Sequence, residues 1–339
     1  MDDGGQGHGS PRRTRRWWIA LVVIVVVGIG GALAVYWATL VPRETLAPVP
    51  SVSLTPSPVA TPVGPACASD ATTWVSVTLA TDAGDINAAV GVISYRVDAA
   101  GVPANVHATD GSHVVIDVCE QIADSDLTWM VGWVTHAGDL TFHQVLAQAT
   151  VYSPDFVVPG PGTDSSDLDP VLADKLGWRP TADEVSGVHY GDVCPSDGGW
   201  FQRDPVTGTG FICDSAQQVA DLLGPTLVDG MVVGSADAVD AAHSWLGVSS
   251  IAIGLEPPRA HDYWSSADYL MSQPGPRNQL AMALDGVVIS SPVSRMDVGT
   301  SPIAIGVAGL TEKDAPALAA VIATSQTPMT FDVVEITHR

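Results

Sequence analysis

Positive charge is scarce in this chain, which has 14 lysines and arginines against 37 aspartates and glutamates, for a formal net charge of −23 at pH 7. Only Lys175 and Lys313 are lysines. A surface with this balance repels phosphate groups, so nucleic acid is excluded as a partner and anionic lipid headgroups are disfavoured. Solubility is a sufficient explanation for most of the acidity.

Catalytic signatures are also missing. The sequence contains no G-x-S-x-G, no H-E-x-x-H and no phosphate-binding loop. Asp164, Asp167 and Asp169 could bind calcium, but the further oxygen ligands and the glycine of an EF-hand loop are absent, which favours a solvated acidic loop. Asp285 is better explained by a turn with Gly286 than by acid–base chemistry.

Several histidines and carboxylates fall near the expected strands of the first folded unit, without the spacing of a metal site. A shared metal or a carboxylate pair would require the fold to bring them together, and we expect scattered or hydrogen-bonded side chains instead. These residues are His107, His113, His136, His143, Asp85, Asp117 and Asp139. The sequence therefore predicts no enzyme activity, no cofactor and no metal.

Cysteine is rare, and an even count in an oxidising compartment predicts two disulfides. The four residues are Cys67, Cys119, Cys194 and Cys213. We favour Cys194–Cys213, which closes a short Gly-rich loop, and by elimination Cys67–Cys119. Buried free thiols are the alternative, and the spacings do not fit a C-x-x-C zinc site.

Residues 19–41 form one long apolar run without charge. As a helix this run spans roughly 34 Å, enough to cross a hydrocarbon core of about 30 Å. Four arginines precede it and Arg43 follows it, which places the N-terminus in the cytoplasm. A cleaved signal peptide would have a shorter apolar region and a small-residue exit. We therefore predict a cytoplasmic tail at 1–16 and a single membrane helix at 17–41.

The rest of the chain is predicted to be extracytoplasmic and tied to the cell membrane. Residues 42–69 are a Pro-rich linker, and its proline-bearing part, 42–66, stays extended, up to about 75 Å at 3.1 Å per residue. Its prolines are Pro42, Pro48, Pro50, Pro56, Pro58, Pro62 and Pro65. Such a linker allows a folded domain to stand off the bilayer, and the bilayer is its partner through the anchor.

Hydrophobic periodicity next predicts an α+β unit. The expected elements are a strand at 72–80, a helix at 85–97, a hairpin of 105–109 with 113–119 around Asp110-Gly111, a helix at 124–134 and a strand at 140–147. This order of strand, helix, hairpin, helix and strand describes a ferredoxin-like sandwich.

Composition changes over residues 152–215, which are rich in Gly, Pro, Asp and Ser and contain a short helical pattern at 169–176. We interpret them as an insertion held by the second disulfide. Trp200 and Phe201 lie in it and suit either a protein contact or core packing.

A second α+β unit follows. Its expected elements are strands at 250–255, 278–284, 287–290 and 302–307, a helix at 259–271 and a helix over 317–324. The last helix is capped by Thr311 or by Asp314, and we favour Asp314 because Pro316 then falls in the first turn. A final strand at 330–336 has no obvious place in this unit and is a candidate to return to the first.

Three stretches carry a family pattern in the same order along the chain. The first, 88–146, has a helix ending in R-x-D-x-x-G-V, then a turn glycine running into apolar residues, then L-x-F-x-x-V. The residues are Arg96, Asp98, Gly101, Val102, then Gly111 to Val115, then Leu140, Phe142 and Val145. The second is FICDSAQQVADLLGP at 211–225, and the third begins QLAMALDGVVISSPV at 279–293. Together they resemble the first large extracytoplasmic domain of the protein-export subunit SecD, often fused as SecDF.

The resemblance implies a ferredoxin-like base subdomain at 70–151 with 328–339, and an inserted head subdomain at 216–327. It implies binding of exported or unfolded polypeptide, or of the Sec translocon, without identifying the binding residues; head positions such as Val288 are expected to contact clients. The chain stops at Arg339, before the family's proton-linked membrane helices, so we expect no motor of its own. The alternative is a structural or regulatory envelope ectodomain that pairs with another membrane protein.

Overall fold

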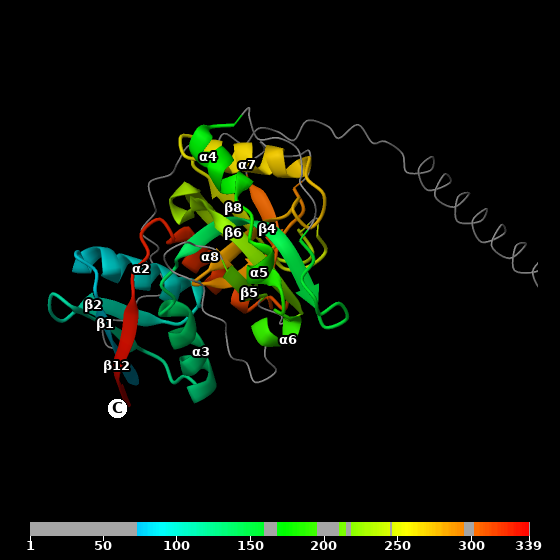
Figure 1. The fold of residues 1–339 in the computed structure, drawn as a ribbon. Coiled ribbons are helices and arrows are strands. Elements are labelled where there is room, and N and C mark those ends of the chain that lie inside the picture. The colour runs from blue at the N-terminus through cyan, green and yellow to red at the C-terminus, as the bar shows by residue number, and fades with distance from the viewer. Residues whose placement is uncertain are drawn as a thin grey trace, which may run out of the picture. The chain divides into compact units, whose positions relative to one another are not determined.

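The computed structural model describes residues 73–158, 168–194, 210–214, 218–244, 246–294 and 302–338 (Figure 1). They belong to one unit that runs from Pro56 to Arg339. Within these ranges no helix has the length and apolarity needed to cross a bilayer. The predicted membrane helix at 17–41 and the linker at 42–69 lie outside the described residues and stay predictions.

The first sheet has four antiparallel strands in the order β12-β1-β3-β2. They are β1 (Val75–Thr81), β2 (Ala104–Ala108), β3 (His113–Val118) and β12 (Phe331–His338). Two helices, α2 (Ile86–Ala99) and α3 (Asp124–Val134), pack on one face of this sheet. The apolar side chains of β1 and β3 alternate toward that face, which is the period expected for a half-buried strand.

The expected strand at 140–147 does not join this sheet, which corrects the sequence-based assignment. It is β4 (Leu140–Thr150), which lies in a second sheet between β6 and β9. Nearly all of β4 is buried, so both faces of the strand must pack against other elements. An edge position beside β1 would leave part of the strand exposed. The candidate return of the last strand is confirmed, because β12 takes that edge. The strand order is the ferredoxin-like one, with the fourth strand supplied from the far end of the sequence.

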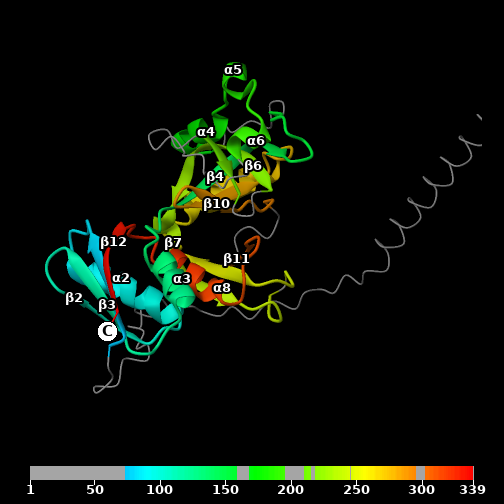
Figure 2. The ribbon, with the colours of Figure 1, turned by 90° about the horizontal axis from the view of Figure 1, so that it is seen from below.

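The second sheet has five strands in the order β10-β9-β4-β6-β5. Its further members are β5 (Gly210–Cys213), β6 (Val219–Asp229), β9 (Leu280–Leu284) and β10 (Val287–Ser290). A third sheet has the order β11-β8-β7, with β7 (Val233–Val239), β8 (Ser250–Leu255) and β11 (Ile303–Gly306). The helices α7 (His261–Met271) and α8 (Asp314–Ala323) share one large apolar core with strands of both sheets. Helix α8 lies beside β7 (Figure 2).

The five-stranded sheet curls until its two outer strands meet. Asp214, which follows β5, forms a parallel bridge with Val288 of β10. A small buried cluster takes one apolar side chain from each of the five strands, namely Val145, Ile212, Leu223, Ala281 and Val288. The sheet therefore encloses a core of its own, as a small barrel does.

Turns and caps follow local chemistry. Asp85 caps α2 by accepting a hydrogen bond from the Asn87 N–H (2.9 Å). Asp285 and Gly286 both have positive φ (50° and 79°), as a tight hairpin turn requires, so the turn interpretation of Asp285 is confirmed. The preference for Asp314 as a cap was wrong. The helix begins at Asp314, and the Thr311 hydroxyl accepts the Asp314 N–H (3.1 Å).

The predicted insertion contains α4 (Pro170–Gly177), α5 (Ala182–Val185), α6 (Tyr190–Val193) and β5. The predicted Cys194–Cys213 disulfide is confirmed and ties the end of α6 to β5. Cys119 is also disulfide-bonded. Its predicted partner Cys67 lies outside the described residues, so that pairing stays a prediction.

Candidate functional site

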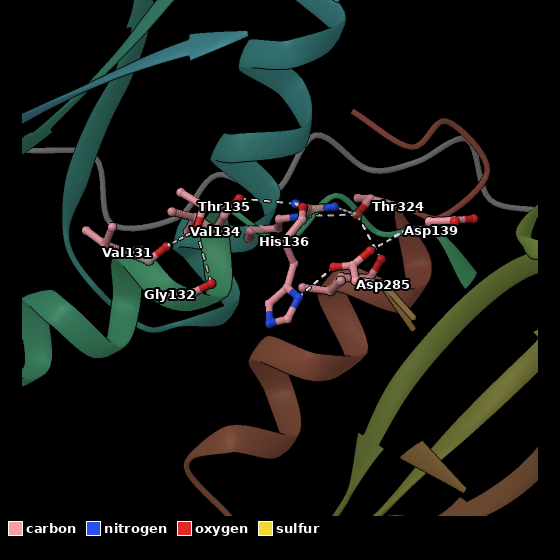
Figure 3. Close-up of polar contacts among 10 residues, drawn as sticks. Val131, Gly132, Val134, Thr135, His136, Asp139, Asp285 and Thr324 are labelled. Atoms are coloured by element: carbon pink, nitrogen blue, oxygen red, sulfur yellow. Dashed lines mark hydrogen bonds and ion pairs between the residues drawn. The ribbon is translucent and has the colours of Figure 1, made fainter. Parts of the chain in front are cut away.

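A buried arginine joins the first sheet to the rest of the fold. Arg96 lies near the end of α2 and is only 1% exposed. Its Nη1 donates to the carbonyl of Val134 (3.1 Å) and to that of His136, both just at the end of α3. Its Nε and Nη2 donate to the hydroxyl of Thr324, which follows α8 (3.1 and 2.9 Å; Figure 3). The guanidinium thus binds the C-terminal ends of two helices, where acceptors and negative dipole ends gather.

A histidine and two aspartates complete this cluster, which we call the Arg96 junction (Arg96, His136, Asp139, Asp285 and Thr324). His136 Nδ1 lies 2.6 Å from Asp285 Oδ2 (Figure 3). The Asp139 N–H donates to Asp285 Oδ1 (2.7 Å), and the Asp285 N–H donates to the Asp139 carbonyl (2.9 Å). The turn between β9 and β10 is therefore fixed to the segment that leaves α3.

The charged groups of the Arg96 junction stabilise one another. Burial disfavours ionisation of Asp285, but hydrogen bonds from His136 and the Asp139 N–H, with the Arg96 charge, lower its pKa below 3.8. Burial lowers the pKa of Arg96 to about 10, and Asp285 opposes that shift. Both groups are therefore charged at neutral pH, and the junction acts as a structural link.

The two connections between the first sheet and the remaining fold run side by side next to this junction. The Met329 N–H donates to the Ala137 carbonyl (3.0 Å). A Cβ at Gly230 would lie 2.6 Å from the Ser325 carbonyl oxygen, so only glycine permits this approach of the chains. The segment that leaves α8 is thus held close to both Ala137 and Gly230 before the chain enters β12.

The other histidines and carboxylates singled out in the sequence are dispersed. His107 lies 3.9 Å from Asp117 on the neighbouring strand. His113 contacts Asp110 (2.9 Å) within its hairpin. His143 is buried in β4, with its ring nitrogens 2.9 Å from the Gly224 carbonyl and the Thr141 hydroxyl. Besides the His107–Asp117 pair, His136, Asp139 and Asp285 come together, and the described residues contain no group of three such side chains able to hold a metal.

Some predicted contact residues are placed differently or are not described. Val288 is 1% exposed and so is not a surface position, which corrects its use as a client contact. Asp169 caps α4 through the Val171 N–H (2.9 Å). Asp164, Asp167, Trp200 and Phe201 lie outside the described residues.

An exposed apolar strand was missed by sequence reasoning. Val333, Val334 and Ile336 of β12 are 44%, 57% and 41% exposed. β12 pairs with β1 on one side, and no described strand pairs with its other side. The adjacent valines in the segment TFDVVEI were the available signal, because a solvated edge strand does not ordinarily carry them. We call this surface the β12 edge.

The chain resembles solved structures of SecDF. No protein-family model matches the sequence, and no curated protein matches it. A crystal structure of SecDF in a super-membrane-facing form has 19% identity and a TM-score of 0.47, covering 78% of this chain and 30% of that chain. A structure of a membrane component SecDF that enhances protein export has 18% identity and a TM-score of 0.46, covering 78% of this chain and 100% of that chain.

A third structure, SecDF from Thermus thermophilus, is described as a translocon-associated membrane protein. It has 17% identity and a TM-score of 0.29, covering 81% of this chain and 32% of that chain. The chain spans less than a third of the first of these proteins and about a third of the last. A resemblance at this level does not fix a shared activity.

Proposed function

We propose that this protein is a SecD-like, membrane-anchored extracytoplasmic domain that binds exported or unfolded polypeptide, as an accessory to protein export. The observation that carries the proposal is the β12 edge. It presents eight residues of strand with three exposed apolar side chains. The order of SecD-like motifs along the sequence supports the same role.

Strand addition is the mode of binding that this surface suits. An extended polypeptide can form main-chain hydrogen bonds with a free strand edge regardless of its sequence, which fits a binder of many clients. The apolar side chains add contact area for unfolded segments. The opposite edge of the same sheet, β2, has five residues and exposes Asn105 and His107, so it is shorter and more polar.

Site-specific photo-crosslinking of the full-length membrane form tests this proposal. A crosslinker at Val334 should trap polypeptides in transit, and one at Val151, an equally exposed valine elsewhere (60%), should not. Lysine at Val334 and Ile336 should abolish capture by charging the edge. Capture that is equal from both positions, or absent from Val334, would overturn the proposal.

The membrane anchor is part of the same proposal. We expect the intact protein to remain in the membrane fraction after alkaline extraction and its folded domain to be cleaved by protease added outside the cell. Recovery of the full chain from the medium would contradict it.

The same edge suits a second candidate function, in which a strand of one dedicated envelope protein occupies it permanently. Co-purification of the membrane form distinguishes the two. A single stoichiometric partner, bound whether or not secretion is active, favours the structural role. Substoichiometric clients that vanish when secretion stops favour the export role.

A further inference from the structure

A cavity of about 310 Å³ lies between strands of the curled five-stranded sheet and the end of β11. This is close to the lower limit for small-molecule sites, so the cavity suits a single chemical group or side chain. Strands β4, β6, β10 and β11 contribute residues to its lining, and Gln279 contributes from the segment just before β9. Its lining residues are Gln148, Asp214, Val219, Asp221, Gln279, Val288, Ile289, Ser290, Ser291, Gly306 and Ala308.

A buried carboxylate faces this cavity. Asp221 of β6 is 1% exposed. Its Oδ1 accepts a hydrogen bond from Gln148 Nε2 (2.8 Å), and its Oδ2 accepts one from the Ser291 hydroxyl (3.0 Å). Both donors are neutral. Burial raises the pKa of Asp221 to about 6, against the effect of these two hydrogen bonds and with a small contribution from Asp214.

The lining offers more acceptors than donors. Gln148 Nε2 also donates to Gln279 Oε1 (2.9 Å), Gln279 Nε2 donates to Gln148 Oε1 (3.4 Å), and the Ser290 hydroxyl donates to the Gly306 carbonyl (2.9 Å), so these donors already have acceptors. Asp214 Oδ1 accepts the N–H groups of Gln218 (2.6 Å) and Val219 (3.1 Å). Among the residues that the structure describes, the lining contains two carboxylates and no lysine, arginine or histidine. A buried carboxylate without a cation is costly, and a ligand that brings positive charge and N–H donors would offset that cost.

We propose that this cavity binds the guanidinium or ammonium group of a basic ligand, with the Asp221 carboxylate as its counter-ion and Gln148, Gln279 and Asp214 as further acceptors. The side chains of Val288, Ile289 and Ala308 then border the alkyl part of the ligand. The net charge of −23 attracts such ligands to the protein. This inference does not depend on strand addition at the β12 edge, and either can fail alone.

A calorimetric titration of the full protein with two blocked amino acids tests it. N-acetyl-arginine amide should bind at pH 7.5, and the citrulline analogue, which has nearly the same shape but no charge, should bind at least tenfold more weakly. Asp221→Asn should reduce arginine binding at least tenfold. Asp268→Asn, which removes the same charge from an exposed position on α7, should leave it unchanged.

The pH dependence supplies a test that needs no variant. Arginine binding should weaken as pH falls from 7.5 to 5, because Asp221 becomes protonated around pH 6. Asp214 is the other titratable group among the described residues of the lining, and Asp214→Asn should keep this profile. Equal binding of the citrulline analogue, a flat pH profile, or calcium binding at Asp221 without arginine binding would each overturn the proposal.

A final comparison identifies the source of the cation. If methylguanidinium binds as well as the peptide Gly-Arg-Gly, blocked at both ends, the cavity recognises the cationic group alone and accepts free amines. If the peptide binds more tightly, the ligand is a basic side chain of a polypeptide. Both results support a cation site.

Discussion

The Thr324 hydroxyl accepts hydrogen bonds from both Nε and Nη2 of Arg96, although the two residues are 228 positions apart in the sequence. Arg96 lies on the base and Thr324 ends the last helix of the head. A single arginine side chain therefore holds together elements that no local sequence pattern relates.

Replacement of Arg96 by methionine should destabilise the fold by about 2–4 kcal/mol. The carbonyls of Val134 and His136 and the Thr324 hydroxyl would lose their donor while remaining buried. Urea denaturation measures the loss. The control is Arg259→Met, which removes a half-exposed pair with Glu256 and should change stability by less than about 1 kcal/mol. Equal effects of the two changes would contradict this role of Arg96.

Alanine at Gly230 should destabilise the protein by roughly 1–3 kcal/mol, because the new Cβ would overlap the Ser325 carbonyl. The matched change is Gly91→Ala within α2, where nothing lies within 4 Å of the new Cβ. That change should stabilise by about 0.5–1 kcal/mol through helix propensity. Thermal unfolding of the two variants should shift in opposite directions; a shift of the same sign would count against the close approach.

Lowering the pH should weaken the Arg96 junction, because the Asp285 carboxylate becomes protonated. Because the folded-state pKa of Asp285 lies below 3.8, its contribution is complete above pH 4 and is lost as pH falls through the folded-state value. Asp285→Asn should therefore be less stable than the unmodified protein at pH 7, with the difference shrinking as the pH falls below 3.8. Denaturation curves across this range measure it. A difference that stays constant with pH would show that the carboxylate charge is irrelevant.

The contribution of Asp221 to stability should depend on pH in the opposite direction. Its folded-state pKa is raised to about 6, so its contribution is complete below pH 4 and is lost as pH rises through 6. A shift of about 2 pKa units corresponds to roughly 3 kcal/mol at most. Asp221→Asn should therefore be more stable than the unmodified protein at pH 7.5 and similar to it at pH 4. A variant that is less stable at pH 7.5 would contradict the burial of an unpaired charge.

Removal of the Cys194–Cys213 disulfide should cost about 3 kcal/mol, the entropy expected for closing a short loop. The two cysteines are 19 positions apart. The Cys194→Ala, Cys213→Ala double variant should show lower unfolding midpoints, with faster hydrogen exchange in β5 than in the distant β8. Unchanged exchange in β5 would show that β6 alone holds that strand.

Local structure could be predicted from the sequence where periodicity and turn chemistry act over a few residues. The helix at Asp124–Val134 and the strand at Ser250–Leu255 have the expected bounds. The Asp285-Gly286 turn follows from residues that tolerate positive φ.

Pairing between distant segments could not be predicted in the same way. The segment LTFHQVLA contains nothing that distinguishes an edge beside β1 from a central place between β6 and β9. Arg96 lies on the apolar side of a helix, and Asp221 lies within the run VADLLG. Both residues interact with partners far along the chain, and these partners give them their roles. The Arg96 junction and the Asp221 cavity are therefore properties of the tertiary fold.

Synthesis of the chain imposes an order on its assembly, because β1 near the start pairs with β12 at the other end of the described residues. During translation β1 pairs with β3 on one side, and the main-chain groups on its other side stay unpaired until β12 has been synthesised. The head, whose strands are contiguous apart from β4, can fold in the meantime. A nascent chain halted before Phe331 is thus expected to present the unpaired edge of β1 to chaperones until the final strand adds to the sheet.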